Sequence, residues 1–195
     1  MRWLIVVSTV LLLFGCASKP PVAPPDLSRP SIAETKSVVF AGKTYVLKYQ
    51  ARGNVPLWEY FLAPESVNAW SELVDFRLAP PQTTGNEPRD LANLTAQAHK
   101  QEYPNLPVEM FSDEKTDAIY VLLFYPTSTR KDGSFFEFNI FKYYKDNGTG
   151  QIISFHFAKN IPSDTPAARQ ELPGHMARLR AEVIPAMGEF PLYRQ

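Results

Sequence analysis

The amino-acid sequence predicts an α+β domain, built as a three-layer α/β/α sandwich around a mostly antiparallel sheet. Three observations predict this class. Segments with alternating apolar residues recur along the chain, segments with helical period separate and follow them, and the stretch AIYVLLFY is apolar at odd and even positions alike. A strand of that last kind is covered on both faces, which calls for helices on both sides of the sheet.

The first part of the domain is expected to contain three strands and a helix. SVVFAGKTYVLKYQ carries β-branched and aromatic residues around Gly42, which predicts two short strands with a turn, and PLWEYFL predicts a third strand. In PESVNAWSELVDFRLAP the apolar residues recur with helical period, which predicts a helix with one apolar face: Val67, Trp70, Leu73, Val74 and Leu78. Glu72 and Asp75 would then share a solvated edge of that helix.

The second part is expected to contain a helix, an antiparallel meander and a terminal helix. EPRDLANLTAQAHKQEYP has a thinner apolar stripe and predicts the helix, while SFFEFNIFKYY and QIISFHFAK alternate as strands do. KDNGTG between those strands is typical of a hairpin turn; its GTG is half of a dinucleotide fingerprint, but it leads into a strand rather than a helix. The last helix has Met176, Leu179, Val183 and Met187 in register, and Pro173 and Pro185 are expected to break or bend its ends.

The stretch LLLFGCASKP holds the only cysteine of the chain, at the end of its only long apolar run. That run follows Arg2, has the length of a signal-peptide core and is too short to cross a bilayer. LFGC resembles the lipobox of bacterial lipoproteins. The resemblance implies a signal peptide over residues 1–15, a lipid on Cys16, and an outer-membrane address in Ala17, with the inner membrane as the alternative. The competing interpretation is an ordinary signal peptide with a free cysteine.

Residues 16–36 form the predicted tether between the lipid and a single domain over residues 37–195. The segment is rich in proline and contains no aromatic residue, so it is expected to stay extended and to contribute nothing to the core. At about 3.1 Å per residue it would hold the domain up to roughly 60 Å from the bilayer.

Charge and cysteine content bear on the partners of the protein and on the source of its stability. Removal of Arg2 with the signal peptide leaves 19 Lys and Arg residues of the original 20, against 20 Asp and Glu residues. This balance leaves no basic footprint for nucleic acid, so we expect no nucleic-acid partner. With one cysteine no internal disulfide can form, and a hydrophobic core must supply the stability.

The order of elements, with the stretch PLWEYFLAPESVNAWSELVDFR, is similar to the PsbP/DcrB-like superfamily over residues 38–190. That superfamily consists mostly of small binding and assembly factors, so the resemblance implies a binding domain and no catalytic residues.

The three histidines, His99, His156 and His175, have no spacing typical of zinc ligands, and neither a metal nor a cofactor is predicted. His99 and His175 lie among polar neighbours and are expected to be solvated. His156 shares a strand face with Ser154 and is the best placed for function; the structural alternative is an imidazole partly buried under a helix. No Gly-x-Ser-x-Gly elbow marks a nucleophile, and we predict no catalytic residue. A Ser-His-Asp set assembled from distant parts of the chain is the alternative.

Tyr143, Tyr144 and Phe141 place aromatic groups on both faces of one strand. A helix is expected to cover the second face, although an exposed patch for a partner is the alternative. Tyr144 and His156 are therefore the candidate partner contacts. The leading hypothesis is a non-enzymatic lipoprotein, held at the periplasmic face of the outer membrane, that binds a periplasmic protein. The partner would be an envelope or secretion-system component to be assembled, or a secreted toxin to be neutralised. A cell-envelope hydrolase and a small-ligand carrier are the alternatives.

Overall fold

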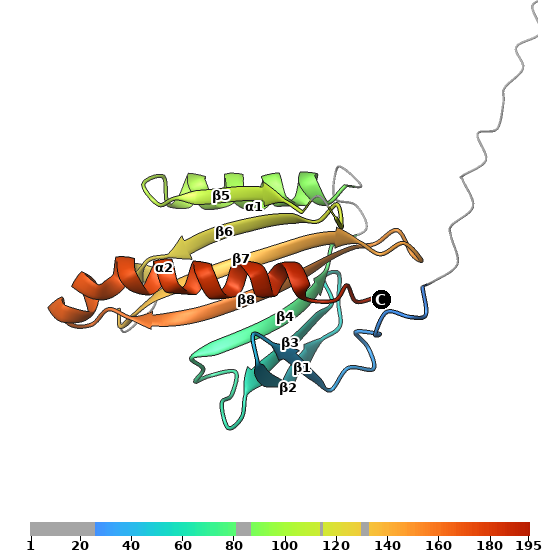
Figure 1. Ribbon diagram of the computed structural model, residues 1–195, viewed down its shortest axis with the longest axis horizontal. Helices are drawn as coiled ribbons and strands as arrows, with labels where there is room; N and C mark the ends of the chain where they lie inside the picture. Colours follow the sequence, from blue (N-terminus) through green and yellow to red (C-terminus); the bar gives the residue numbers. More distant parts are fainter. Residues whose placement is uncertain (1–25, 81–86, 114, 130–132) are drawn as a thin grey trace, which may run out of the picture.

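The computed structural model describes residues 26–80, 87–113, 115–129 and 133–195 (Figure 1). Cys16, the lipobox and the first part of the predicted tether lie outside the described residues. One antiparallel sheet of eight strands, with two α-helices, confirms the α+β class and the antiparallel pairing; its strand order is β1-β2-β3-β4-β8-β7-β6-β5. The strands are β1 (Ser37–Phe40), β2 (Lys43–Ala51), β3 (Leu57–Leu62), β4 (Glu72–Leu78), β5 (Val108–Ser112), β6 (Ile119–Tyr125), β7 (Phe135–Lys145) and β8 (Ile152–Pro162); the helices are α1 (Pro88–Glu102) and α2 (Pro166–Glu189), with a 3₁₀ turn at Thr127–Thr129.

The hairpin of β7 and β8 lies at the centre of the sheet, and each of its strands has 11 residues. The predicted turn in KDNGTG joins them, so that prediction is confirmed. Asp146 accepts hydrogen bonds from the Gly148 amide and the Thr149 hydroxyl, and Gly150 has φ of 71°, a left-handed conformation that favours glycine. The turn therefore sets the register of the two central strands.

The two helices pack on opposite faces of the sheet, α2 in front and α1 behind in Figure 1. Side chains alternate between the faces along each strand. On one face, Leu179 and Val183 of α2 join the large aromatic core, and on the other, Ala92 and Ala96 of α1 pack on β6. Strand β6 is buried on both faces, as predicted. A complete three-layer sandwich is not established, because α1 packs against β5, β6 and β7 and does not extend over β1 to β4.

The helix predicted over residues 64–80 is wrong, because residues 72–78 form strand β4 between β3 and β8. Both faces of β4 are buried, so its apolar residues occur at odd and even positions and fit a helical period as well as a strand. Pairing with two neighbouring strands decides between them. Glu72 and Asp75 are consequently buried on opposite faces, rather than sharing a solvated edge.

Two further differences concern strand β5 and helix α2. Strand β5 has no counterpart among the predicted strands. Helix α1 matches its prediction, but α2 continues through Pro173 and Pro185 instead of ending at them. Packing of Leu179, Val183 and Met187 against the sheet holds α2 in place between these two prolines and beyond the second.

The folded part begins before Ser37. Ile32 is 1% exposed and belongs to the core, so the expectation that the whole of residues 16–36 stays out of the core is wrong. The Ile32 amide donates to the Arg194 carbonyl at 3.0 Å, and the Arg194 amide donates to the Pro30 carbonyl at 3.0 Å. The start of the domain is thus paired with the C-terminal segment, as their neighbouring positions in Figure 1 show.

Candidate functional site

Four residues on neighbouring strands stand directly opposite one another on the sheet face that α1 partly covers. We call them the polar row: Tyr49 of β2, Glu59 of β3, Asp75 of β4 and His156 of β8. The row continues under α1 as Phe141 of β7. It therefore runs from an exposed aromatic side chain, through two carboxylates, into the helix-covered core.

The buried end of the row is a chain of hydrogen bonds. His156 is 4% exposed; its Nδ1 lies 2.7 Å from Asp75 Oδ2 and its Nε2 lies 2.8 Å from Asn139 Oδ1. The imidazole also stacks on Phe141, with 4.1 Å between ring centroids. Both ring nitrogens are engaged, so the ring is fixed in position.

Arg77 completes the environment of Asp75. Its Nε and Nη2 donate to the two carboxylate oxygens of Asp75, each at 2.9 Å. Burial alone would raise the pKa of Asp75, but the charges and hydrogen bonds of His156 and Arg77 outweigh it and lower that pKa below its ordinary value. Asp75 is therefore a carboxylate whose hydrogen-bonding partners lie within the fold.

Glu59 differs from Asp75 in this respect. It is half-buried, and among the described residues its carboxylate is influenced only by burial and by the charges of Asp75 and Arg77, with no hydrogen bond. Burial, followed by repulsion from Asp75, raises the pKa of Glu59, and Arg77 offsets this only in part. In the part of the chain that the structure describes, the charge of Glu59 has no direct partner.

The sheet face that carries Glu59 also has accessible apolar side chains. We call it the open face: Val39, Tyr49, Leu57, Glu59 and Arg77. Val39 is 65% exposed and Tyr49 is 44% exposed, while the other three are half-buried. Trp70 borders the open face and packs against Phe61 and Leu73. Together these residues form a surface that a macromolecule can contact.

The second buried carboxylate, Glu72, lies on the opposite face and is fully partnered. Lys43 Nζ donates to both of its oxygens at 2.8 Å, Tyr45 Oη donates at 2.9 Å, and Lys159 forms a further ion pair. Burial raises the pKa of Glu72, but these donors lower it more, and the net pKa lies below its usual value. This cluster joins β2, β4 and β8 and has no free acceptor to offer a ligand.

The residues predicted as partner contacts do not lie on the surface. Tyr144 is 2% exposed, and its hydroxyl accepts a hydrogen bond from the Tyr193 amide at 3.0 Å. His156 is buried in the polar row, as its structural alternative describes, although α1 does not cover the whole row. Neither side chain can touch a partner without rearrangement of the sheet. Aromatic groups do occupy both faces of β7, with Phe141 and Tyr143 on the α1 side.

The other two histidines occupy different environments. His99, expected to be solvated, is buried between the rings of Tyr103 and Tyr125, and neither of its nitrogens has a hydrogen-bond partner among the described residues. His175 is more exposed and lies 3.6 Å from Glu171. Within the described ranges, no three His, Cys, Asp or Glu residues cluster as metal ligands would. None of the helices in these ranges is long and apolar enough to cross a bilayer.

Most of the polar row could not be predicted from the sequence pattern. Asp75 and Arg77 are two residues apart in ELVDFRL, which places both on one face of a strand. The helical assignment of this stretch separated them from His156. Asn139 and Glu59 had no local signal, because only the strand register brings them to this face.

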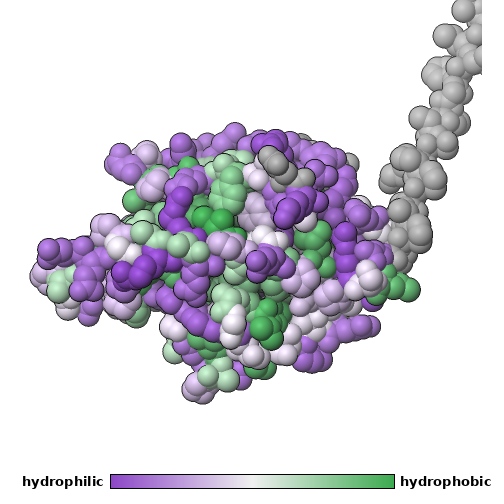
Figure 2. Space-filling view, in the orientation of Figure 1, coloured by the Kyte–Doolittle hydropathy of each residue, from purple (hydrophilic) through white to green (hydrophobic). Residues whose placement is uncertain are grey.

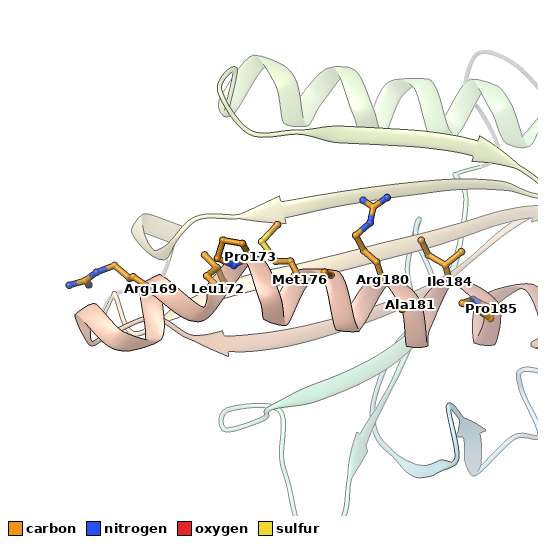
Figure 3. A pocket seen from close by; sticks show the side chains of 9 residues that line it. Arg169, Leu172, Pro173, Met176, Arg180, Ala181, Ile184 and Pro185 are labelled. Atoms are coloured by element: carbon orange, nitrogen blue, oxygen red, sulfur yellow. The ribbon is translucent and has the colours of Figure 1, made fainter.

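A second surface feature is the α2 groove, an open hollow of about 820 Å³ beside α2. Figure 3 shows that Met176, Arg180 and Ile184 project from α2 toward β5 and β6, and Arg180 forms an ion pair with Glu109 of β5. Figure 2 shows hydrophobic residues on this side of α2. The lining is mostly apolar: Leu172, Pro173, Met176, Ala177, Ala181, Ile184 and Pro185, with Arg169 and Arg180.

The fold and these surfaces define an α+β domain with an open sheet face and an apolar groove beside α2. A protein-family model matches residues 32–192, and the chain belongs to that family. The match includes every strand and both helices, and it begins at Ile32 in the N-terminal segment that packs into the core. No curated protein and no solved structure matches the chain.

Proposed function

We propose that this protein is a lipid-anchored lipoprotein at the periplasmic face of the outer membrane, and that its domain binds a protein partner through the open face. The observation that carries the proposal is the open face itself. It combines exposed Val39 and Tyr49 with an arginine and with Glu59, which has no direct partner among the described residues. Tyrosine and arginine are enriched among the residues that dominate binding energy in protein interfaces.

The partner would be an envelope or secretion-system component, or a toxin that the protein neutralises. Both kinds of partner are macromolecules that a broad sheet face can contact, unlike a small substrate held in a deep pocket. In this proposal the helices make a three-layer arrangement only over part of the sheet, and the remainder of one face is left for the partner. The proposal requires no metal, cofactor or catalytic residue.

Cys16 would supply the anchor. Two or more acyl chains give stable membrane attachment, whereas one chain gives marginal binding. Because the domain already includes Ile32, the spacer is shorter than the sequence alone suggests. Residues 17–25 could span at most about 28 Å at 3.1 Å per residue.

Site-specific photo-crosslinking in the living bacterium tests the partner-binding surface. A benzophenone amino acid at Tyr49 is compared with one at Leu94 of α1, which is 43% exposed against 44% for Tyr49. We expect a discrete crosslinked protein from position 49 and none from position 94. Equal crosslinking at both positions, or none at either, contradicts the proposal.

Fatty-acid labelling tests the anchor separately. Cells are fed an alkyne fatty acid, and the wild-type protein is compared with Cys16→Ser. We expect label in the wild type alone, together with a longer, mislocalised precursor in the variant. Equal label in both proteins would show that Cys16 is not the attachment point.

The α2 groove supports the carrier alternative as a second candidate function. Its volume and apolar lining suit an extended hydrocarbon chain. The test is titration of the purified protein with a dansyl-labelled fatty acid. The carrier function requires saturable binding that Met176→Lys abolishes and Leu94→Lys preserves. The hydrolase alternative has no comparable support, because both nitrogens of His156 are engaged and Ser154 stands opposite Arg77 and Tyr143 rather than the imidazole.

A further inference from the structure

We infer that the open face recognises a cationic side chain, a lysine or arginine of the partner with apolar neighbours, and that Glu59 is its counter-charge. This inference rests on the proposed function and names the chemistry of the partner at the same surface.

The argument begins with the difference between the carboxylates of the sheet. Asp75 receives two hydrogen bonds from Arg77 and one interaction from His156, and Glu72 receives bonds from two lysines and a tyrosine. Glu59 stands directly opposite Asp75 and receives none of these. Within the described ranges, these two buried carboxylates therefore have direct partners and the half-buried Glu59 has none.

Neither Arg77 nor His156 can readily turn to Glu59. Both donor nitrogens that Arg77 presents to Asp75 lie 2.9 Å from its oxygens, in the paired geometry that holds a guanidinium most firmly. His156 is buried between Asp75 and Asn139. Among the residues that the structure describes, none pairs with Glu59 directly, so a direct counter-charge can be supplied by another molecule.

Docking makes this requirement stronger. A partner that covers the open face removes the remaining water from Glu59, and an ionised carboxylate without a donor is strongly disfavoured when buried. With a neutral or acidic partner, the cost of burying Glu59 would therefore cancel much of the binding free energy from the apolar contacts. A partner that places an ammonium or guanidinium group at Glu59 gains a charge-assisted hydrogen bond instead.

The residues beside Glu59 suit the same ligand. Tyr49 stands directly opposite Glu59 on β2, so its ring can lie against the cation or its aliphatic stem. Leu57, on the same face of β3 as Glu59, supplies apolar surface for a neighbouring side chain of the partner, and Val39 lies farther along this face, opposite Thr44 of β2. The expected recognition element is thus one basic residue flanked by apolar ones.

Three synthetic tripeptides test the inference: acetyl-Leu-Arg-Phe-amide, its citrulline analogue and its glutamate analogue. Citrulline keeps the shape of arginine without its charge. The protein is labelled with ¹³C, and the Glu59 carboxyl signal is followed during titration with each peptide at millimolar concentration. We expect the arginine peptide to bind about tenfold more tightly than the citrulline peptide, which corresponds to one charge-assisted contact. It should also lower the pKa of Glu59.

Two variants make the result specific. In Glu59→Gln the preference for arginine over citrulline is expected to disappear. In Glu189→Gln, a matched change at an exposed glutamate at the end of α2, the preference should remain. Equal binding of the arginine and citrulline peptides, a preference that survives in Glu59→Gln, or no change in the Glu59 signal with any peptide overturns the inference.

These outcomes separate the inference from the proposed function. A crosslink at position 49 without a preference for arginine overturns the cation assignment and leaves the partner-binding surface standing. A preference for arginine without any crosslink at position 49 shows a cation site and removes the support for a protein partner there. Self-association that shifts the open-face signals as protein concentration rises would instead identify a second copy as the occupant, and would overturn the inference.

Discussion

Substitution of Lys142 by methionine is expected to change how the stability of the protein depends on pH. The side chain of Lys142 is fully buried beneath the end of α2, where its Nζ donates to the carbonyls of Met187 at 2.8 Å and Phe190 at 3.0 Å. Burial lowers the pKa of Lys142 to about 8, although the charge of Asp113 opposes this. Lys142 therefore binds carbonyls at the end of α2, and burial of its side chain costs least free energy when the amine is neutral.

The sign of the effect follows from proton binding. The unfolded chain keeps the proton of a lysine up to a pKa of about 10.4, whereas the folded protein releases it near pH 8. Between these values the unfolded state binds more protons, so the free energy of unfolding rises with pH. The gain amounts to about 1.3 kcal/mol between pH 7 and pH 9.

Lys142→Met removes both the charge and the donor. At pH 7 the loss of two hydrogen bonds to helix carbonyls, about 1–3 kcal/mol, is offset by no longer burying a charge. At pH 9 Lys142 is mostly neutral in the folded protein, so this offset has largely gone. The stability difference between the wild type and the variant should therefore be about 1.3 kcal/mol larger at pH 9 than at pH 7. Tyrosines that ionise at high pH are present in both proteins and cancel in the difference.

Urea denaturation at pH 7, 8 and 9 measures this difference, with Lys48→Met as the control at an exposed lysine of β2. The stability difference between wild type and Lys142→Met should grow with pH, while that for Lys48→Met should stay constant. A constant difference for Lys142→Met would refute the assignment of a buried lysine that titrates near pH 8.

Further predictions concern the core and its buried polar groups. His99→Phe should raise the melting temperature, because it removes two buried nitrogens that have no hydrogen-bond partner among the described residues. Burial lowers the pKa of His99, so below pH 6.5 the unfolded chain binds a proton that the folded protein does not, and stability falls. In His99→Phe this fall should be smaller. Ile32→Ala should cost about 2–4 kcal/mol in a urea titration, and a chain that begins at Ser37 should be less stable than one that begins at residue 26. Asp75→Asn should lower the free energy of unfolding by about 3–5 kcal/mol, because it leaves Arg77 and the imidazole without their carboxylate. If Asp75→Asn at acidic pH regained the stability that the wild type has at neutral pH, this explanation would be contradicted. Trp70→Ala should cost about 1–3 kcal/mol, less than for a fully buried tryptophan, because Trp70 is only partly buried.

Local chemistry determined much of the fold in advance. The β7–β8 hairpin could be predicted from KDNGTG between two alternating stretches, because turn residues and strand period agree there. Helix α1 and the two-sided burial of β6 followed in the same way. These elements are specified by residues close together in the chain, and no distant contact overrides them.

The polar row and its open face depended on the tertiary structure instead. The stretch ELVDFRL fits a helix and a doubly buried strand equally well, and only pairing with β3 and β8 places Asp75 beside His156. Ile32 likewise gives no local sign of burial among its prolines, because its place in the core depends on the backbone of Arg194 at the other end of the chain. Contacts between residues far apart in sequence thus decided which charges are buried with partners, and among the described residues they left Glu59 without a direct one.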